Sequence, residues 1–458
     1  MKKIARGYLL DLFLISLLFI TIPLFFFKLG QSSLVSFDEA WYADIARNII
    51  KTKDLIHLSW NGKIYTDHPP AGFWIIATSF KIFGISDYSA RFSQALAGFL
   101  GIIFLYLLGK ELFNRAVGLF SAISLTSANW FLFRARSGNL DSFLVMFFIL
   151  TLYLAIKASK NSKFLAPFSI SMSLLLLTKT LVPFTVIPAL LFIFWKSKIT
   201  RNPKFKFYLL MPFILFLIWF GIQIGYDANF TQHYFKIGLS GVEKSLAFVE
   251  NLRLIKVYLH NGIGGWFWPG FFALTLGLAT LKKEFIILFV FFVSFFLPFL
   301  FSGEGHIWHL IPLHPIMILS FFGFSYFILG KVTKSKRLSV VIIFALFLYY
   351  YVPQIQKNWR EYINITAYVS DDAILSKEAS RFSEKLYVDG DFVPTAVFYS
   401  DKQVGQIQRK AKQLKLLFSE ENSFILITHQ WRLDGEDIPP DAYEIIKEDR
   451  DKVLVVRK

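Results

Sequence analysis

The sequence predicts a polytopic α-helical membrane protein with a small soluble α/β domain at its C-terminal end. Composition, long apolar runs and the basic clusters between these runs support this fold class. Of 458 residues, 55% are hydrophobic and 54 are phenylalanine, and the mean hydropathy is +0.50. Only 18% are charged, against about 25% in ordinary soluble domains. A lipid bilayer is the natural solvent for apolar runs of this length.

The first apolar run, Leu9 to Phe27, follows a basic start that contains Lys2, Lys3 and Arg6. No small-residue cleavage site follows it, so we interpret it as a retained span rather than a signal peptide. With the later runs, about eleven spans are expected. The later runs lie near 91–109, 116–133, 142–156, 164–178, 181–195, 207–225, 264–281, 285–301, 308–329 and 338–352.

Charge position predicts the orientation of these spans. If the N-terminus is cytoplasmic, every short basic cluster falls on the cytoplasmic side, as the positive-inside rule expects. These clusters lie within 110–115, 157–163, 196–206, 282–283 and 331–337. The net charge of +17 therefore indicates membrane topology rather than nucleic-acid binding. The chain has no cysteine, which excludes disulfides and thiolate chemistry.

The segment 28–90 is predicted to be a structured periplasmic loop. Asp38 to Ile50 has helical spacing, and Pro69-Pro70 precedes a second amphipathic run, Phe73 to Phe83. Both runs are expected to be helices in the membrane interface. A span starting at Pro69 is the alternative, but it would invert every later loop and spoil the charge pattern.

The C-terminal residues differ in composition from the rest of the chain. Short β-like runs at 394–399, 424–428 and 452–456 alternate with polar, helix-compatible stretches, which indicates a small α/β domain. We expect a transmembrane domain over 1–352 and a periplasmic soluble domain over 353–458.

Two polar groupings stand out in the first loop. Asp38 and Glu39 follow the first span directly, at a depth where charge is costly and usually functional. The alternative is an acidic cap on a surface helix. Asp67 and His68 precede the proline-started helix and suit a cation, a phosphate or a sugar hydroxyl. The alternative is N-capping by Asp67, with His68 in solvent.

Further groupings lie in short outer links. Arg134, Arg136 and Asp141 share one link, where arginine suits bidentate phosphate recognition and the alternative is snorkelling toward headgroups. Lys179 stands alone between two apolar runs, either to neutralise a phosphate or as a plain connection. The fifth grouping is a weak metal candidate by its spacing. It contains Glu304, His306 and His309.

All five groupings fall on one predicted membrane face, although they come from distant parts of the chain. They combine carboxylates with cations, which is what group transfer from an anionic lipid phosphate needs. A carboxylate can orient or deprotonate an acceptor, and a cation can stabilise a departing phosphate. A lipid or solute transporter is the main alternative, but it would place charges along a path through the spans. A non-catalytic assembly protein is the third reading.

At these residues the sequence resembles a known group of bacterial enzymes. It is similar to GT-C glycosyltransferases of the aminoarabinose transferase and lipid A or core galacturonosyltransferase type (glycosyltransferase family 83), related more distantly to protein O-mannosyltransferases. The likeness covers roughly residues 1–330 by motif order. The motifs that carry it are Asp38-Glu39-Ala40-x-Tyr42-Ala43-x-Ile45-Ala46-Arg47, Pro70-Ala71-Gly72-Phe73-Trp74, Arg91-Phe92, Asp141, Thr178-Lys179 and Leu310-Ile311-Pro312.

The resemblance implies a GT-C fold and assigns roles to these residues. Asp38 takes the place of the catalytic aspartate with Glu39 beside it, Asp141 is a second carboxylate, and Lys179 is expected near the donor phosphate. Candidate donor-phosphate or substrate residues are Tyr42, Asp67, His68, Arg91, Arg134, Arg136, Lys179 and His306. His68 stands where lysine is usual, which replaces a permanent cation with a titratable one. Thr180 stands where glycine is common.

The expected function is therefore inverting transfer of a sugar from a polyprenyl-phosphate donor, in a bacterial inner membrane with the active site periplasmic. Aminoarabinose, galacturonic acid and hexoses remain open as the sugar, and lipid A or lipopolysaccharide core is the expected acceptor. A protein O-mannosyltransferase-like reaction is an alternative. No cofactor is expected, and a divalent cation is left open. No nucleic-acid partner is expected.

Overall fold

The structure is a computed structural model of the whole chain, and it divides the chain into two compact units. The first comprises Met1–Lys28, Thr66–Gly72 and Phe92–Ile365, and the second comprises Leu29–Tyr65, Phe73–Arg91 and Thr366–Lys458. The described residues are 2–34, 37–195, 197–239, 248–301, 306–390, 392–408, 410 and 412–458. Each unit is considered by itself below.

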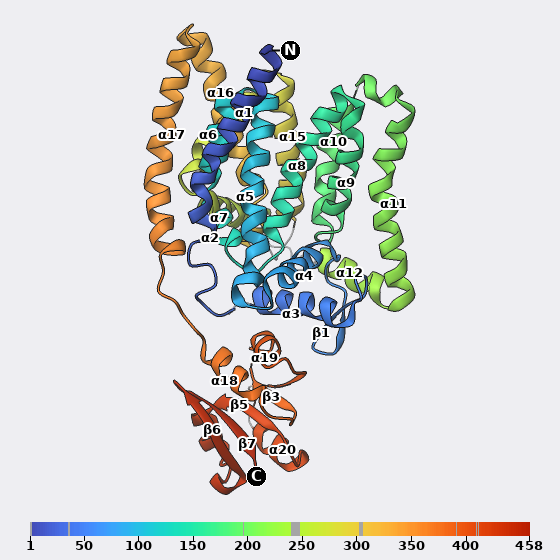
Figure 1. Cartoon of the computed structure of the whole chain (residues 1–458), viewed down its shortest axis with the longest axis vertical. Coiled ribbons are helices and arrows are strands. Elements are labelled where there is room, and N and C mark those ends of the chain that lie inside the picture. The colour runs from blue at the N-terminus through green and yellow to red at the C-terminus, as the bar shows by residue number, and fades with distance from the viewer. Residues whose placement is uncertain are drawn as a thin grey trace. The chain divides into compact units, whose positions relative to one another are not determined.

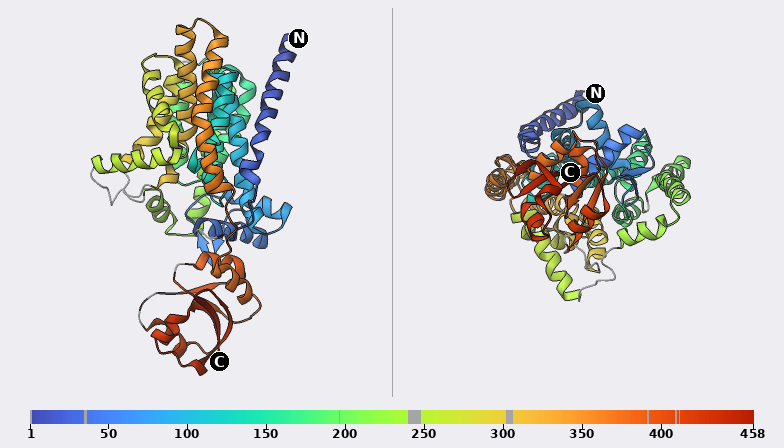
Figure 2. Two further views of the ribbon diagram at one scale, coloured as in Figure 1. Left: turned by 90° about the vertical axis from the view of Figure 1, so that its left-hand side faces the viewer. Right: turned by 90° about the horizontal axis from the view of Figure 1, so that it is seen from below.

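The first unit is a bundle of helices (Figures 1 and 2). Its α-helices are α1 (Lys2–Leu18), α2 (Ile22–Phe26), α5 (Asp87–Leu112, whose first turn belongs to the second unit), α6 (Arg115–Leu125), α7 (Asn129–Ala135), α8 (Asp141–Lys160), α9 (Leu165–Leu176), α10 (Ile187–Phe194), α11 (Pro203–Tyr226), α12 (Phe230–Gly238), α13 (Phe248–Ile263), α14 (Phe267–Leu278), α15 (Lys283–Leu300), α16 (Leu313–Val332) and α17 (Lys336–Asn358). Short 3-10 or π turns connect them: η1 (Phe19–Thr21), η2 (Ser162–Phe164), η3 (Val182–Val186), η4 (Lys198–Arg201), η5 (Gly264–Trp266), η6 (Ile307–Leu310) and η7 (Trp359–Ile363).

The chain is a multi-span membrane protein, but the expected count of about eleven spans is not confirmed. Among the described residues, 7 helices are long and apolar enough to cross a membrane, or 8 if α6 and α7 form one bent span. Helices occupy the other expected positions too, but α9 and α10 have only 12 and 8 residues. A turn at Lys179 separates these two helices. A helix break at this point inside a bilayer-spanning segment would leave backbone polar groups without partners, which is energetically costly.

Local sequence explains where several helices begin. Asn114 caps α6 by accepting hydrogen bonds from two backbone N–H groups of its first turn. Asn202 caps α11 by accepting one hydrogen bond, from the Lys204 backbone N–H, and Pro203 occupies the first helical position, where its missing N–H costs nothing. Ser335 caps α17. Gly109 and Gly118 allow α5 and α6 to touch, because a Cβ on Gly118 would lie 2.5 Å from the Tyr106 carbonyl oxygen.

A sharp break separates α6 from α7, which are bent by 69°. The carbonyl of Ser127 at this break accepts hydrogen bonds from the side-chain amides of Gln354 (3.1 Å) and Asn358 (2.8 Å) in α17. The indole of Trp266 donates to the Ser127 hydroxyl at 2.9 Å. Backbone polar groups freed inside an apolar bundle must find such partners, so these amides stabilise the break.

The second unit combines part of the first loop with the C-terminal residues. From the loop come α3 (Phe37–Thr52), β1 (Leu58–Trp60), β2 (Lys63–Tyr65) and α4 (Ala71–Phe83, whose first two residues belong to the first unit). The C-terminal elements are α18 (Asp371–Ala379), β3 (Leu386–Asp389), α19 (Val393–Ser400), β4 (Val404–Ile407), α20 (Gln413–Glu420), β5 (Ile425–His429), α21 (Gln430–Gly435), η8 (Pro440–Ala442), β6 (Tyr443–Asp449) and β7 (Lys452–Arg457). The two expected loop helices correspond to α3 and α4.

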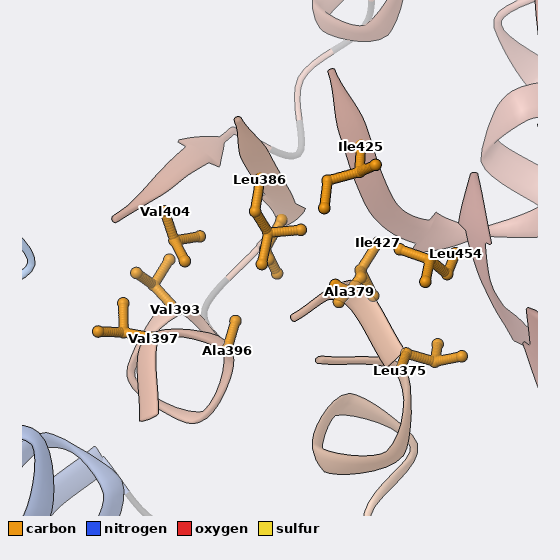
Figure 3. Close-up of a cluster of buried hydrophobic side chains, with 11 residues drawn as sticks. Leu375, Ala379, Leu386, Val393, Ala396, Val397, Val404, Ile425, Ile427 and Leu454 are labelled. Carbon is orange, nitrogen blue, oxygen red and sulfur yellow. The ribbon is translucent and has the colours of Figure 1, made fainter. Parts of the chain in front are cut away.

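The expected small α/β domain is confirmed. Its five strands have the order β4-β3-β5-β7-β6, with β3 parallel to β4 and β5, and β7 antiparallel to β5 and β6. Figure 3 shows the apolar core between this sheet and the helices α18 and α19. The buried side chains include Leu386, Ile425, Ile427 and Leu454 from the sheet.

The structure corrects one expected strand. Residues 394–399 lie within helix α19 rather than in a strand, whereas 424–428 and 452–456 correspond to β5 and β7. Pro394 sits in the first turn of α19, where proline favours a helix start. Asp401 then ends the helix in the left-handed conformation, with φ of 59°. The compact units group residues 29–65 and 73–91 with the C-terminal elements, so a domain boundary at 352 stays a prediction.

Candidate active site

One buried carboxylate organises the polar groups of the first unit. Asp141, the first residue of α8, is 2% exposed. One of its oxygens accepts a hydrogen bond from Lys179 Nζ at 2.7 Å. The other accepts from Arg134 Nε at 2.8 Å, with Arg134 Nη2 at 2.7 Å. Two cations from different turns of the bundle therefore share one carboxylate.

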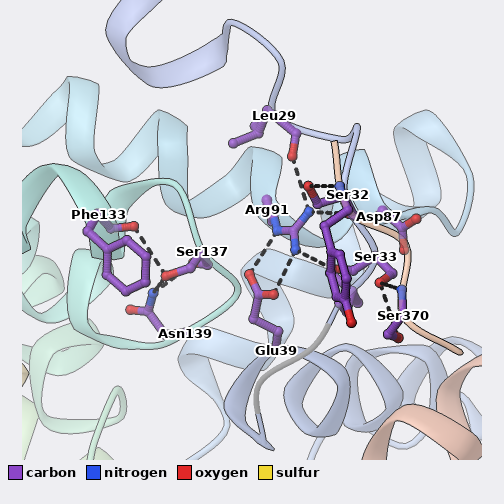
Figure 4. Close-up of polar contacts among 12 residues, drawn as sticks. Leu29, Ser32, Ser33, Glu39, Asp87, Arg91, Phe133, Ser137, Asn139 and Ser370 are labelled. Atoms are coloured by element: carbon purple, nitrogen blue, oxygen red, sulfur yellow. Dashed lines mark hydrogen bonds and ion pairs between the residues drawn. The ribbon is translucent and has the colours of Figure 1, made fainter. Parts of the chain in front are cut away.

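The link before α8 holds this carboxylate in place. Asn139 is fully buried, and its side-chain carbonyl accepts a hydrogen bond from the Asp141 backbone N–H at 2.8 Å. Its amide nitrogen donates to the carbonyls of Arg134 (2.6 Å) and Ser137 (2.7 Å). Figure 4 shows Asn139 beside Ser137 in this link. A single asparagine thereby fixes both ends of the link that carries the Arg134–Asp141 pair.

The Lys179 turn is docked on the segment that contains Asp67 and His68. Thr180 donates its hydroxyl hydrogen to the Asp67 carbonyl at 2.7 Å, and His68 Nδ1 lies 2.7 Å from the same hydroxyl oxygen. Because a hydroxyl has only one hydrogen, His68 Nδ1 must be the donor to Thr180. The Ala71 backbone N–H also donates to the Leu177 carbonyl, at 2.9 Å. Two segments far apart in sequence are thus fastened together.

His68 is a neutral group in this setting. Burial lowers its pKa to about 4, and the nearby positive charge of Lys179 contributes to the same shift. His309 is also neutral, because burial and the charge of Lys179 lower its pKa to about 3. His68 therefore does not supply the permanent positive charge that lysine would supply at its position.

The Asp67 side chain has its own partner. Its carboxylate lies 2.6 Å from His233 Nε2 of α12, and both side chains are partly exposed. Gly72 lets the start of α4 approach α8 closely, since a Cβ there would lie 2.5 Å from a methyl carbon of Leu140. These contacts bring α12 and the start of α4 to the same end of the bundle as Asp141.

The cations of this group could contact an anion. Arg134 and Lys179 carry positive charges beside the buried Asp141 carboxylate, Asp67 is a further carboxylate near His68, and His68 and His309 are neutral. Trp308 covers the Arg134 guanidinium, which lies 5.3 Å from its ring centroid. Arginine and lysine side chains at a partly enclosed position can bind a phosphate ester through charge-assisted hydrogen bonds. We call Arg134, Asp141, Lys179 and His68 the ionic cluster.

The second unit holds four further candidate residues, Asp38, Glu39, Tyr42 and Arg91, and Figure 4 shows the contacts of Arg91 with Glu39 and the preceding loop. Arg91 donates from Nε and Nη2 to the two Glu39 oxygens at 2.8 Å and 2.7 Å. It also donates to the carbonyls of Leu29 (3.2 Å), Ser32 (2.7 Å) and Ser33 (2.9 Å). All five guanidinium hydrogens are thereby used. This geometry favours a structural role for Arg91 and Glu39, because their ion pair fastens α3 to the preceding loop.

Asp38 precedes Glu39 in the first turn of α3 and is half-buried. The Glu39–Arg91 ion pair anchors the helix turn that contains Asp38. Tyr42, 8% exposed, packs edge-on against Phe73 with ring centroids 5.4 Å apart. Its ring therefore belongs to a buried aromatic group, and its predicted role in substrate binding stays a prediction.

Arg136 contacts the backbone rather than the ionic cluster. It donates to the carbonyls of Leu24 (3.0 Å), Phe25 (3.1 Å) and Phe27 (2.8 Å) at the end of α2. It also donates to the Tyr362 carbonyl at 3.2 Å. These are the carbonyls that a helix end leaves without intrahelical partners, so this geometry favours a structural role for Arg136.

A metal site has no support among the described residues, where no three histidine, aspartate or glutamate side chains converge. Glu304 lies outside the described residues, so the weak candidate set is not tested as a whole. His306 is exposed and stacks on Trp308 with ring centroids 4.5 Å apart. The His306 and His309 ring centroids are 5.3 Å apart.

Several members of the site escape prediction from the sequence. Four residues hold a predicted site residue in place but belong to no recognisable motif: Asn139, Thr180, His233 and Trp308. His233 lies 166 residues from Asp67, and Thr180 lies 112 residues from His68. Thr180 had one signal, since it stands where glycine is usual after the Lys179 position.

Comparison with known proteins gives one family model and several relatives. The family model described as dolichyl-phosphate-mannose-protein mannosyltransferase matches residues 67–220. An uncharacterised protein of Aquifex aeolicus is 32% identical over 209 residues, covering 44% of this chain and 41% of its own. The undecaprenyl phosphate-α-4-amino-4-deoxy-L-arabinose arabinosyl transferase 2 of Pseudomonas fluorescens is 26% identical over 174 residues, covering 37% and 30%. The chain thus spans less than half the length of either relative.

The fold has a full-length counterpart. The crystal structure of ArnT from Cupriavidus metallidurans bound to undecaprenyl phosphate superposes with a TM-score of 0.71 over 99% of this chain and 98% of ArnT, at 15% identity. The chain therefore has the GT-C fold of ArnT. The predicted resemblance to aminoarabinose transferases, with a relation to protein mannosyltransferases, is confirmed.

Proposed function

We propose that the chain is an inverting glycosyltransferase that moves a sugar from a polyprenyl-phosphate carrier to an acceptor at the periplasmic face of a bacterial inner membrane. The observation that carries this proposal is the ionic cluster, whose two cations share one buried carboxylate in a chain with the ArnT fold. The name of its relative from Pseudomonas fluorescens supports a lipid-linked sugar donor.

The proposed reaction has a simple bond balance. An acceptor oxygen attacks the anomeric carbon of the donor sugar, and the bond from that carbon to the phosphate oxygen breaks. The polyprenyl phosphate leaves with the bonding electron pair, and the acceptor proton passes to a base. Lys179 and Arg134 would stabilise the charge that develops on the departing phosphate. Asp141 would hold these two cations in position.

Asp38 is the proposed base where the acceptor is a hydroxyl. If the acceptor is a lipid A phosphate, it is already a nucleophile, and Asp38 would orient it instead. Lipid A or lipopolysaccharide core is the proposed acceptor, with aminoarabinose, galacturonic acid or a hexose as the sugar. A mannose transfer to protein is the second candidate, because the matching family model carries that description.

The first test is mass spectrometry of lipid A, core oligosaccharide and envelope glycoproteins from matched strains. One strain carries the intact gene, and the others carry Asp38→Ala, Lys179→Gln or the exposed control Asp441→Ala, at equal protein levels. We expect a sugar-mass increment that is present with the intact gene and the control and lost in the other two. Its absence from every fraction, together with carrier flux in proteoliposomes, would favour a transporter.

A further inference from the structure

Helix α7 carries Arg134 in its last turn but cannot fix its own position. It has 7 residues, and a bend of 69° separates it from α6, so α6 does not impose its direction. A helix of two turns is too short to be stable alone, because nucleation is costly and few hydrogen bonds form within it. Contacts with other helices therefore decide where its last turn and the Arg134 guanidinium lie.

Two amides of α17 hold the chain at the start of α7. The Ser127 carbonyl at the break accepts hydrogen bonds from Gln354 Nε2 at 3.1 Å and from Asn358 Nδ2 at 2.8 Å. Asn358 is fully buried, and Gln354 Oε1 accepts a hydrogen bond from the Gly265 backbone N–H, so both amides are themselves fixed. One donor would satisfy the Ser127 carbonyl, whereas two donors from successive turns of one helix also fix its direction.

The turn that follows α17 contacts the other end of α7. Arg136, which ends α7, donates from Nε to the Tyr362 carbonyl of η7 at 3.2 Å. The π-helical turn η7 continues directly from Asn358, and π turns occur frequently at functional sites. One continuous segment, 354–362, thus contacts the chain at both ends of α7. This segment lies outside residues 67–220, the region that the family model matches.

The length of α7 makes the position of Arg134 sensitive to these contacts. Arg134 follows Ser127 by two helical turns, which is about 10 Å along a helix axis. A tilt of about 6° at the break would therefore move the last turn of α7 by about 1 Å. A misplacement of about 1 Å in a site can cost about 10²-fold in rate, even when its cause is distant from the chemistry. The guanidinium that donates to Asp141 at 2.8 Å is thus placed by contacts at the far end of its helix.

We propose that Gln354 and Asn358 are positioning residues for Arg134, so that α17 completes the candidate active site. They act through the Ser127 carbonyl and α7 and do not touch the substrate themselves. Removal of one amide leaves this carbonyl with the other donor, so the fold is retained. Helix α7 then gains freedom to tilt, and the guanidinium leaves the position that suits a phosphate. This proposal rests on the donor-phosphate role of Arg134 in the proposed function and adds the residues that place it.

The test is a double-mutant cycle on the binding of undecaprenyl phosphate to the full-length protein in detergent. The four forms are wild type, Asn358→Leu, Arg134→Gln and the double variant, and thermal midpoints check that each is folded. We expect Asn358→Leu to raise the Kd about tenfold when Arg134 is present, and by less than about twofold in the Arg134→Gln background. Gln356→Leu, which replaces an exposed amide on the same helix, should leave the Kd unchanged.

The outcomes separate this proposal from the proposed function. An equal rise of the Kd in both backgrounds, or no rise in either, would overturn the positioning role, because a general effect on the fold does not depend on Arg134. A Kd that Arg134→Gln leaves unchanged would overturn it too, since Arg134 would then not meet the phosphate.

The variants are chosen so that the cycle can be completed. In Arg134→Gln the buried Asp141 keeps its bond to Lys179, and Gln354→Met replaces Asn358→Leu if the latter does not fold. Coupling between α17 and Arg134, with no transfer from any polyprenyl-phosphate sugar, would refute the transferase function and leave the positioning role standing. Transfer without coupling would overturn the positioning role and leave the transferase function standing.

Discussion

Because His68 is neutral in the folded protein, the free energy of unfolding should depend on pH in a way that can be calculated. Burial and the charge of Lys179 lower its pKa from 6.5 to about 4 in the folded protein. The unfolded chain therefore takes up a proton at His68 at a pH where the folded chain does not. The contribution of His68 to the free energy of unfolding therefore has its full value above pH 6.5 and is lost as the pH falls toward 4. The full difference corresponds to about 3 kcal/mol of unfolding free energy.

The control variant is His68→Asn, whose amide can still donate to Thr180. Denaturant titrations in mixed micelles at intervals from pH 7.5 to 4 give the unfolding free energy of each form. We expect the wild-type value to fall more steeply than that of the variant below pH 6.5. His309 contributes with the same sign in both proteins, so the difference between the two curves isolates His68.

The cause of the shift can be tested separately. Lys179→Met removes the second contribution to the lowered pKa of His68, so the steep region of the His68-dependent curve should move to higher pH. Parallel pH curves for wild type and His68→Asn would refute the reasoning. They would mean that His68 titrates alike in the folded and unfolded chains and that water reaches the imidazole freely.

Three further predictions concern the contacts that build the site. Lys179→Met should lower the rate of sugar transfer by roughly 10²–10³-fold with unchanged folding, measured as turnover of a labelled lipid-linked donor, and Lys179→Arg should retain part of that rate. Arg91→Lys should lower the unfolding free energy by about 3 kcal/mol in denaturant titrations, because a lysine cannot replace the two bonds to Glu39; an unchanged midpoint would contradict this. Gly72→Ala should destabilise by about 1–3 kcal/mol through its clash with Leu140, seen as a lower thermal midpoint, whereas the exposed Gly330→Ala should not.

The large features of the fold could be predicted because they depend on local patterns. Apolar runs and the basic clusters between them indicated helices, and helices occupy these positions in the structure. The number of true spans could not be predicted in this way. The turn at Lys179 and the break at Ser127 interrupt apolar runs, and only contacts with distant amides such as Gln354 explain how the break is tolerated.

The misassigned helix α19 shows a limit of short-range propensity. Val393, Val397 and Phe398 favour a strand by residue type, and the run is no longer than an ordinary strand. The proline in the first turn favours a helix start, and the apolar side chains are buried against β3 and β4. Tertiary packing therefore decides between two local preferences that the sequence leaves nearly balanced.

The candidate residues of the two units include cations of two kinds, which the sequence alone does not separate. Arg91 and Arg136 donate to backbone carbonyls of segments that they fasten, and the hydrogens of Arg91 are all used. Binding a phosphate there would break contacts that hold the loop and α2. Lys179 and Arg134 instead both contact the Asp141 carboxylate, Lys179 through one oxygen and Arg134 through the other.

This difference predicts which cations an anion can recruit without unfolding its surroundings. An incoming phosphate can compete with Asp141 for Lys179 while Asp141 keeps its bonds to Arg134, so the carboxylate is never left buried and unpaired. The same phosphate at Arg91 would strand Glu39, a buried charge whose unpairing costs several kcal/mol. We therefore propose that the donor binds at Lys179 and that Arg91 belongs to the framework that holds α3, even though both are isolated basic residues at the ends of apolar runs.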